Sequence, residues 1–153
     1  QECSRDAWRL DPSRSASAER RYRHLTRECQ VARLRQGHDT ISGRFSHGAH
    51  AQSTVQSLVE RLLDGRETPL GLPPLVVVRF RGQLWVVMGN RRFWALKEYA
   101  RRAAAEPRVR AAVHDWPFDH LPRPLQLVMI AKALQAISSL DGGRQASLWR
   151  PGK

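Results

Sequence analysis

The clearest periodic pattern of apolar positions in the chain lies between residues 53 and 65. Its valines and leucines recur at intervals of three and four residues, which is the spacing of one face of an α-helix. Ser53 and Gln56 form a capping-box pair at the start of the pattern, and Gly65 follows its last leucine. We therefore predict a helix from Ser53 to Gly65 that packs on a sheet or on another helix. Its apolar face consists of Val55, Leu58, Val59, Leu62 and Leu63.

Two apolar runs come after a segment rich in proline, and they predict the two strands of a hairpin. The runs are Leu75–Phe80 and Leu84–Met88, with Arg81-Gly82-Gln83 as the turn between them. The first run opens with four consecutive apolar residues, Leu75–Val78. Such a run is typical of a strand that is buried on both faces.

A glycine and an asparagine mark the place where the second strand is expected to end and a helix to begin. Gly89 interrupts the strand, and Asn90 is a favourable cap for a helix from about Arg91 to Ala105. Pro107 ends this helix. Its core face is expected to carry Phe93, Leu96 and Ala100.

The last part of the pattern predicts one more strand and one more helix. Arg108–His114 is expected to be the strand. Pro122 and Pro124 begin the helix, which continues to Ile137. Its core face is expected to consist of Leu127, Ile130, Leu134 and Ile137.

The first 37 residues have a weaker pattern. We expect Gln1–Ser17 to be an extended and poorly packed arm, Ala18–Glu28 to be a short helix, and Gln30–Leu34 to be an edge strand. The predicted organisation is a basic N-terminal arm over 1–30, an α/β domain over 31–137 and a C-terminal tail over 138–153. The order of the elements predicts an α/β (α+β) fold, in which helices flank a small mixed β-sheet.

The charge of the chain adds a class of partner to this picture. The net charge is +12, and all but three of the 26 basic residues are arginines. Arginine suits bidentate contacts with phosphate, and a large positive field attracts polyanions. We expect the partner to be a nucleic acid, a nucleotide or an acidic protein surface. A genome whose codon usage favours arginine would produce the same composition without any binding role.

Composition also excludes some classes of protein. No apolar run approaches the length that crosses a bilayer, and the first residues have no apolar core of a secretory signal. Cys3 and Cys29 are too few for a disulfide framework or a zinc ribbon. We expect an intracellular location, an organellar one included, and the sequence indicates no particular compartment.

The turn Gly89-Asn90-Arg91-Arg92 is the strongest candidate for a functional site. A strand that turns directly into a helix exposes backbone N–H groups at the positive end of the helix dipole. Two arginines in the first helical turn are unfavourable there unless an anion lies between them, so the turn predicts a phosphate site. The alternative is that Asp64 or Glu98 pairs with one of the arginines and the other is solvated.

A polar loop before the helix predicted from Ser53 to Gly65 is expected to face this turn. Its candidate residues are Ser42, Arg44, His47 and Gly48. The loop histidines match no zinc-binding spacing, so we predict no metal site. Trp94, beside the arginines, is a candidate for stacking on a base. The chain has no P-loop, no Gly-x-Gly-x-x-Gly run and no nucleophile elbow.

Three segments in this order resemble the ParB/sulfiredoxin superfamily. They are ISGRF (Ile41–Phe45), TVQSLVERLLDG (Thr54–Gly65) and PPLVVVRFRGQLWVVMGNRRFWALKEY (Pro73–Tyr99). The resemblance covers about residues 31–114 and implies the fold of that superfamily. In it, the Gly-x-x-Arg turn binds nucleotide phosphates, of ATP in sulfiredoxins and of CTP in ParB proteins. By position, Gly89, Arg91 and Arg92 would be the phosphate-binding residues.

The chain departs from this superfamily at one position of the turn and after the final helix. Sulfiredoxins carry their catalytic cysteine where this chain has Asn90, and ParB proteins usually carry a glutamate there. ParB proteins also continue into a helix-turn-helix domain, whereas this sequence predicts only one further helix. The resemblance therefore implies neither sulfinic-acid reduction nor clamping on specific DNA.

Three functions remain open at this point. The favoured one is a non-catalytic module that binds nucleic acid or nucleotide, such as a basic subunit of an organellar ribonucleoprotein; ATP or CTP with Mg²⁺ is the cofactor that the resemblance implies. The second is a nucleotide-dependent phosphotransferase or nuclease, with phosphates on Arg91 and Arg92 and acid/base roles for His47 or Asp39. The third is a protein-interaction subunit of a large complex, with its basic face on an acidic surface.

Overall fold

A computed structural model of the chain describes residues 8–36 and 49–138. The described helical elements are η1 (Trp8–Leu10), α2 (Ala16–Arg21), η2 (Arg23–Leu25), η3 (Val31–Arg33), α4 (Ala49–Leu63), η5 (Pro69–Gly71), α5 (Asn90–Ala103) and α6 (Arg123–Ser138). The strands are β1 (Thr26–Gln30), β2 (Leu34–Gln36), β3 (Leu75–Phe80), β4 (Gln83–Met88) and β5 (Arg108–Asp115). None of the described helices is long and apolar enough to span a membrane.

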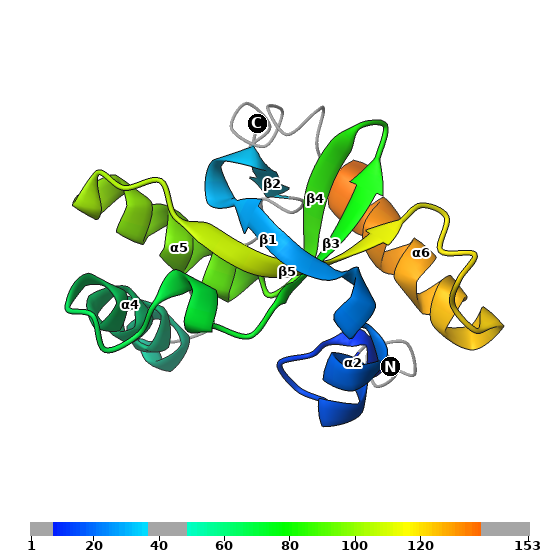
Figure 1. The fold of residues 1–153 in the computed structure, drawn as a ribbon, viewed down its shortest axis with the longest axis horizontal. Coiled ribbons are helices and arrows are strands. Elements are labelled where there is room, and N and C mark those ends of the chain that lie inside the picture. Colours follow the sequence, from blue (N-terminus) through cyan, green and yellow to red (C-terminus); the bar gives the residue numbers. More distant parts are fainter. Residues whose placement is uncertain (1–7, 37–48, 139–153) are drawn as a thin grey trace.

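The five strands form one mixed sheet in the order β1-β5-β3-β4-β2 (Figure 1). β3 pairs parallel with β5 and antiparallel with β4, while β1 and β2 form the two edges. β3 is thus the central strand, and Leu75–Val78 are fully buried, as their uninterrupted apolar run predicts. The predicted fold class, a small mixed sheet with flanking helices, is confirmed.

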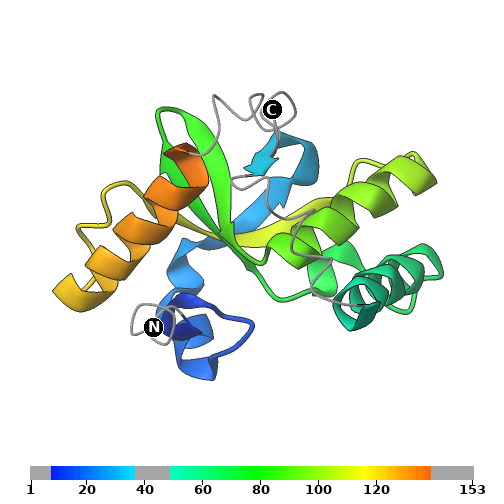
Figure 2. The same ribbon diagram turned by 180° about the vertical axis from the view of Figure 1, so that it is seen from behind.

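Alternate residues of the central strands point into two separate apolar layers. Val76 and Val78 pack in one layer with α6 and with Leu10, Ala18 and Tyr22 of the N-terminal segment, residues 8–25. Leu75 and Val77 pack in the other layer with α5, and α4 lies over α5. The two views agree that α6 and the α4–α5 pair lie on opposite sides of the sheet (Figures 1 and 2).

The elements of the middle of the chain follow the prediction closely. β3 has the predicted bounds, and β4 begins one residue earlier because Gln83 pairs with Phe80. The hairpin turn is therefore Arg81-Gly82, and both residues have positive φ, as a two-residue hairpin turn requires. The predicted start of α4 at Ser53 is wrong, because the helix begins at Ala49.

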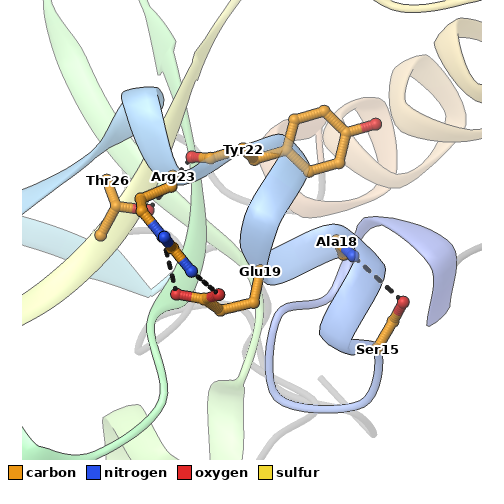
Figure 3. Close-up of polar contacts among 6 residues, drawn as sticks. All are labelled: Ser15, Ala18, Glu19, Tyr22, Arg23 and Thr26. Carbon is orange, nitrogen blue, oxygen red and sulfur yellow. Dashed lines mark hydrogen bonds and ion pairs between the residues drawn. The ribbon is translucent and has the colours of Figure 1, made fainter.

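The expectation of a poorly packed arm is wrong for the described part of residues 1–17. Leu10 is fully buried in the layer that contains α6. Ser15 caps α2, since its hydroxyl accepts a hydrogen bond from the N–H of Ala18 at 3.1 Å (Figure 3). Periodicity does not detect a single buried leucine in a polar segment.

The predicted helix over Ala18–Glu28 and the edge strand over Gln30–Leu34 are also corrected. α2 ends at Arg21, and the chain enters β1 at Thr26. β1 has only one buried side chain, Cys29, so its pattern lacks the alternation that predicts a strand. Backbone pairing with β5 holds it in place.

The predicted core face of α6 is wrong in part, because Ile130 and Ile137 pack against the core whereas Leu127 and Leu134 do not. Leu127 and Leu134 are 51% and 50% exposed, whereas Met129 is fully buried. The face that packs on the sheet consists of Leu125, Val128, Met129, Ala133 and Ala136. Because α6 carries apolar residues on both faces, its periodicity alone does not identify the buried one.

Candidate functional site

The turn between β4 and α5 is built around Gly89. This residue is the N-cap of α5 and has a left-handed backbone, with φ 90° and ψ 26°, so the cap is Gly89 and not Asn90 as predicted. A Cβ at Gly89 would lie 2.5 Å from Nη2 of Arg92 and 2.7 Å from Cδ2 of Leu75. The backbone conformation therefore favours glycine, and a Cβ at this position would require the side chains of Arg92 and Leu75 to shift.

The first turn of α5 has no acidic residue and no side-chain cap among the described residues. The first backbone N–H groups of a helix have no intrahelical acceptor and lie at the positive end of its dipole. This end of α5 therefore has the electrostatic character of an anion site.

Arg91 and Arg92 occupy different environments in this turn. Arg91 is exposed. Arg92 is half-buried, and its Nη2 donates to the carbonyl oxygen of Pro74 at 3.4 Å. Its Nε is buried without a hydrogen-bond partner among the described residues. Burial lowers the pKa of Arg92, and the charge of Asp11 opposes that effect.

The proposed acidic partners of these arginines are engaged elsewhere. Asp64 pairs with Arg66 at 2.8 Å. Glu98 pairs with Arg101 and, at 2.9 Å, with Arg102, and hydrogen bonds from these two guanidiniums lower the pKa of Glu98 to about 2. The alternative in which Asp64 or Glu98 neutralises the turn is therefore wrong. Within the described parts of the chain, neither arginine of the turn forms an ion pair.

Asn90 adds a polar group to the same turn. Its Oδ1 atom is buried and has no hydrogen-bond partner in the described part of the chain. An asparagine amide offers both a carbonyl acceptor and two N–H donors. Asn90 is therefore a polar residue of the turn whose carbonyl acceptor the described residues leave unused.

The remaining predicted site residues are placed as follows. Ser42, Arg44, His47 and Gly48 lie outside the described residues, so their position beside the turn stays a prediction. Phe93 is buried in the core as predicted, and Trp94 is half-buried against the apolar contact between α4 and α5. Over residues 8–36 and 49–138, no group of three or more potential metal ligands comes together.

Two features near the core were not predicted from the sequence. Asp11 is the carboxylate whose charge acts on Arg92, although the two are distant in sequence. Asp11 is buried, and its Oδ1 accepts from the N–H and the hydroxyl of Ser13 at 2.9 and 2.7 Å. His114 is fully buried in β5 and contacts His120. No sequence pattern marks either feature, because both depend on long-range packing.

Comparisons with known proteins found similarity only to solved structures. No family model matches the chain, and no curated protein matches it. Among solved structures, sulfiredoxin from Arabidopsis thaliana is similar with 17% identity and a TM-score of 0.40, over 60% of this chain and 85% of that one. ParB from Caulobacter crescentus complexed with CTP-gamma-S is similar with 20% identity and a TM-score of 0.42. That match covers 76% of this chain and 54% of the ParB chain. The likeness to ParB and sulfiredoxin concerns the fold of part of the chain.

Proposed function

We propose that the Gly89 turn binds a phosphate group of a nucleotide or a nucleic acid, and that the chain acts as a binding module. The observation that carries this proposal is the presence of Arg91 and Arg92 in a first helical turn that has no acidic residue. Cations at this end of a helix face the positive end of its dipole, which is unfavourable. A bound anion removes that cost and also receives the free backbone N–H groups.

The two arginines support different parts of this function. Arg92 lies under the turn, against Gly89 and Pro74, so it fixes the turn and adds a positive charge beneath it. Arg91 is exposed, so its guanidinium is free to fold over a bound phosphate. The net charge of +12 would draw polyanions toward the site.

The enzyme hypothesis receives less support from the described contacts. Phosphoryl transfer and phosphodiester cleavage normally use a carboxylate that holds Mg²⁺ or activates the nucleophile. Asp11 accepts hydrogen bonds from Ser13, and Asp39 and His47 lie outside the described residues. We therefore favour binding without turnover, in an assembly such as a ribonucleoprotein.

A titration of nucleotides against the wild-type protein and two variants tests the proposal. The probes are ATP, ADP, GTP and CTP, with and without Mg²⁺; CTP is included because the ParB neighbour was crystallised with CTP-gamma-S. A nucleotide at 100 times its Kd stabilises the fold by about 2.7 kcal/mol, which a thermal-shift measurement detects. We expect Arg91→Gln to weaken binding at least tenfold.

Arg101→Gln is the matched control, because it removes the same charge from an exposed position in the last turn of the same helix. We expect its affinity to stay within about twofold of the wild type, since charges in the first and last turns sense opposite ends of the dipole. Equal losses in both variants would show that the turn contributes only net charge. Absence of binding by any nucleotide or oligonucleotide would refute the proposal.

A further inference from the structure

The two edges of the sheet come together at η3. β1 and β2 are the outermost strands, yet only the three residues Val31–Arg33 connect them. Such a connection spans at most about 14 Å, whereas the edges of a flat five-stranded sheet lie about 19 Å apart. The sheet is therefore curled, and both views show β1 and β2 close to each other (Figures 1 and 2).

A pocket of about 460 Å³ lies where these edges meet. Its lining comes from β1, from η3, and from the first residues of β4 and β5. Three of the lining side chains are arginines, namely Arg27, Arg33 and Arg108, and a single carboxylate, Glu28, accompanies them. We name this feature the edge pocket. Its excess of positive charge makes it an anion-binding pocket by composition.

Within the described parts of the chain, the arginines of the edge pocket use few of their N–H donors. Nε of Arg33 donates to Oε1 of Gln30 at 2.9 Å, and Nε of Arg108 lies 3.4 Å from Oε1 of Glu28. The Arg27 side chain has no hydrogen bond or ion pair among the described residues. Because each guanidinium has five N–H donors, a single contact orients the group and leaves the rest for a ligand.

We propose that the edge pocket binds the phosphodiester backbone of a single-stranded nucleic acid. Planar guanidiniums match phosphate oxygens, and the volume lies within the range that small-molecule sites occupy. The pocket reaches Leu84 at the start of β4, whereas the Gly89 turn follows the end of that strand. The two sites are thus roughly 17 Å apart along an extended strand. A nucleic-acid strand has phosphates to supply to both sites, whereas a nucleoside monophosphate has one.

Charged side chains on edge strands also have a purely protective role, since they prevent pairing with the edge strands of other molecules. That role requires charge but no ligand. It predicts that removal of the arginines increases self-association. It also predicts that the affinity for nucleic acid falls no further than when the same charge is removed elsewhere on the protein. The two explanations are therefore separable by a charge-matched control.

The test measures binding of a fluorescein-labelled 15-nucleotide single strand by fluorescence anisotropy over a range of salt concentrations. The pocket variant carries Arg27→Gln, Arg33→Gln and Arg108→Gln. The control carries Arg20→Gln, Arg21→Gln and Arg123→Gln, which remove the same charge from exposed positions outside the pocket. We expect the pocket variant to bind at least tenfold more weakly and the control to stay within about threefold. The slope of log K against log salt should fall by about 2 in the pocket variant, because each phosphate that an arginine neutralises contributes about 0.7 to that slope.

Three results would overturn the proposal. They are equal losses of affinity in the two variants, no binding of the single strand by the wild type, or binding of a nucleoside monophosphate in the pocket that is as strong as that of the single strand. If the triple variant does not fold, Arg27→Gln alone keeps the test open, because the Arg27 side chain has no hydrogen bond or ion pair among the described residues. We then expect a threefold loss of affinity, and an unchanged affinity would count against the pocket. Arg91→Gln separates this proposal from the Gly89 turn, since it should lower nucleotide affinity while the contribution of the edge pocket to the salt slope remains.

Discussion

Nδ1 of His114 lies 2.9 Å from Nε2 of His120, and the two rings are stacked with their centroids 5.1 Å apart. His114 is fully buried, and its Nε2 has no hydrogen-bond partner among the described residues. Burial, and then the charges of His120 and His24, lower the pKa of His114 to about 3. Tyr22 packs against the same ring with its centroid 5.2 Å away. A neutral His114 therefore lies between the sheet and the N-terminal segment.

This burial predicts that acid destabilises the fold. Unfolded His114 takes up a proton near its ordinary pKa of 6.5, whereas the folded protein resists protonation down to about pH 3. The unfolded state binds more protons in that window, so the stability that is complete above pH 6.5 is lost progressively as the pH falls. The free energy of unfolding should decrease by up to about 1.4 kcal/mol per pH unit, as measured by urea denaturation between pH 7 and 4.5. The pKa of His120 is also lowered, chiefly by burial, and it adds to the same trend.

The variant His114→Leu checks the source of this dependence. It replaces the imidazole by an apolar side chain of similar size, so the slope between pH 6.5 and 4.5 should become flatter. His24→Gln, at an exposed position, is the control and should keep most of the slope. An unchanged slope in His114→Leu would assign the acid sensitivity to other groups.

Gly89→Ala should destabilise the protein more than the same substitution at another glycine that has a similar backbone conformation. The new Cβ would meet Arg92 and Leu75 at less than 3 Å, and the left-handed backbone adds strain. We expect a loss of about 2–4 kcal/mol in the free energy of unfolding. Gly82→Ala is the control, because Gly82 has φ +76° and open space around it, so the loss should be about 1 kcal/mol. Equal losses would mean that Arg92 does not press on the turn.

Leu10→Ala tests the packing of the N-terminal segment. Leu10 is fully buried, so its truncation leaves a cavity and should cost about 2–5 kcal/mol. Leu70→Ala, at a residue 41% exposed, should cost less than about 1 kcal/mol. Chemical denaturation measures both values. A small loss in Leu10→Ala would restore the expectation of an unpacked arm.

The orientation of α6 is tested by two substitutions in the same helix. Met129→Ala removes a fully buried side chain and should cost about 2–5 kcal/mol. Leu127→Ala, on the exposed face, should cost less than about 1 kcal/mol. The reverse order of these losses in denaturant titrations would support the core face that the periodicity suggested.

The sequence predicted structure correctly where a short run of residues is enough to specify the local conformation. The apolar run of β3 predicts a strand buried on both faces, and the structure places it at the centre of the sheet. The glycine between β4 and α5 predicts a sharp turn, and its φ of 90° confirms that requirement. In both cases the signal lies within a few consecutive residues, so no distant contact is needed to read it.

The sequence patterns did not predict the structure correctly where contacts with distant residues determine it. The polar sequence of β1 forms a strand because β5 supplies hydrogen bonds to its backbone. The inner face of α6 is chosen by Val76, Val78 and their neighbours on the sheet, since the helix offers apolar residues on both sides. The same holds for the candidate site. The turn could be predicted from residues 89–92, whereas the burial of Arg92 beside Pro74 and the effect of the Asp11 charge on the pKa of Arg92 could not.

The sequence by itself determined the central hairpin, the α4 and α5 helices and the position of the arginine turn, because strand and helix periodicity and the backbone freedom of glycine are local properties. Only the tertiary structure decided that Leu10 packs in the core, that Arg92 supports the turn while Arg91 is exposed, and that His114 is buried. It also brought the two sheet edges together at an arginine-lined pocket. Burial and the meeting of charges depend on side chains that are far apart in the chain, and the free energy of packing them together is not contained in any single segment.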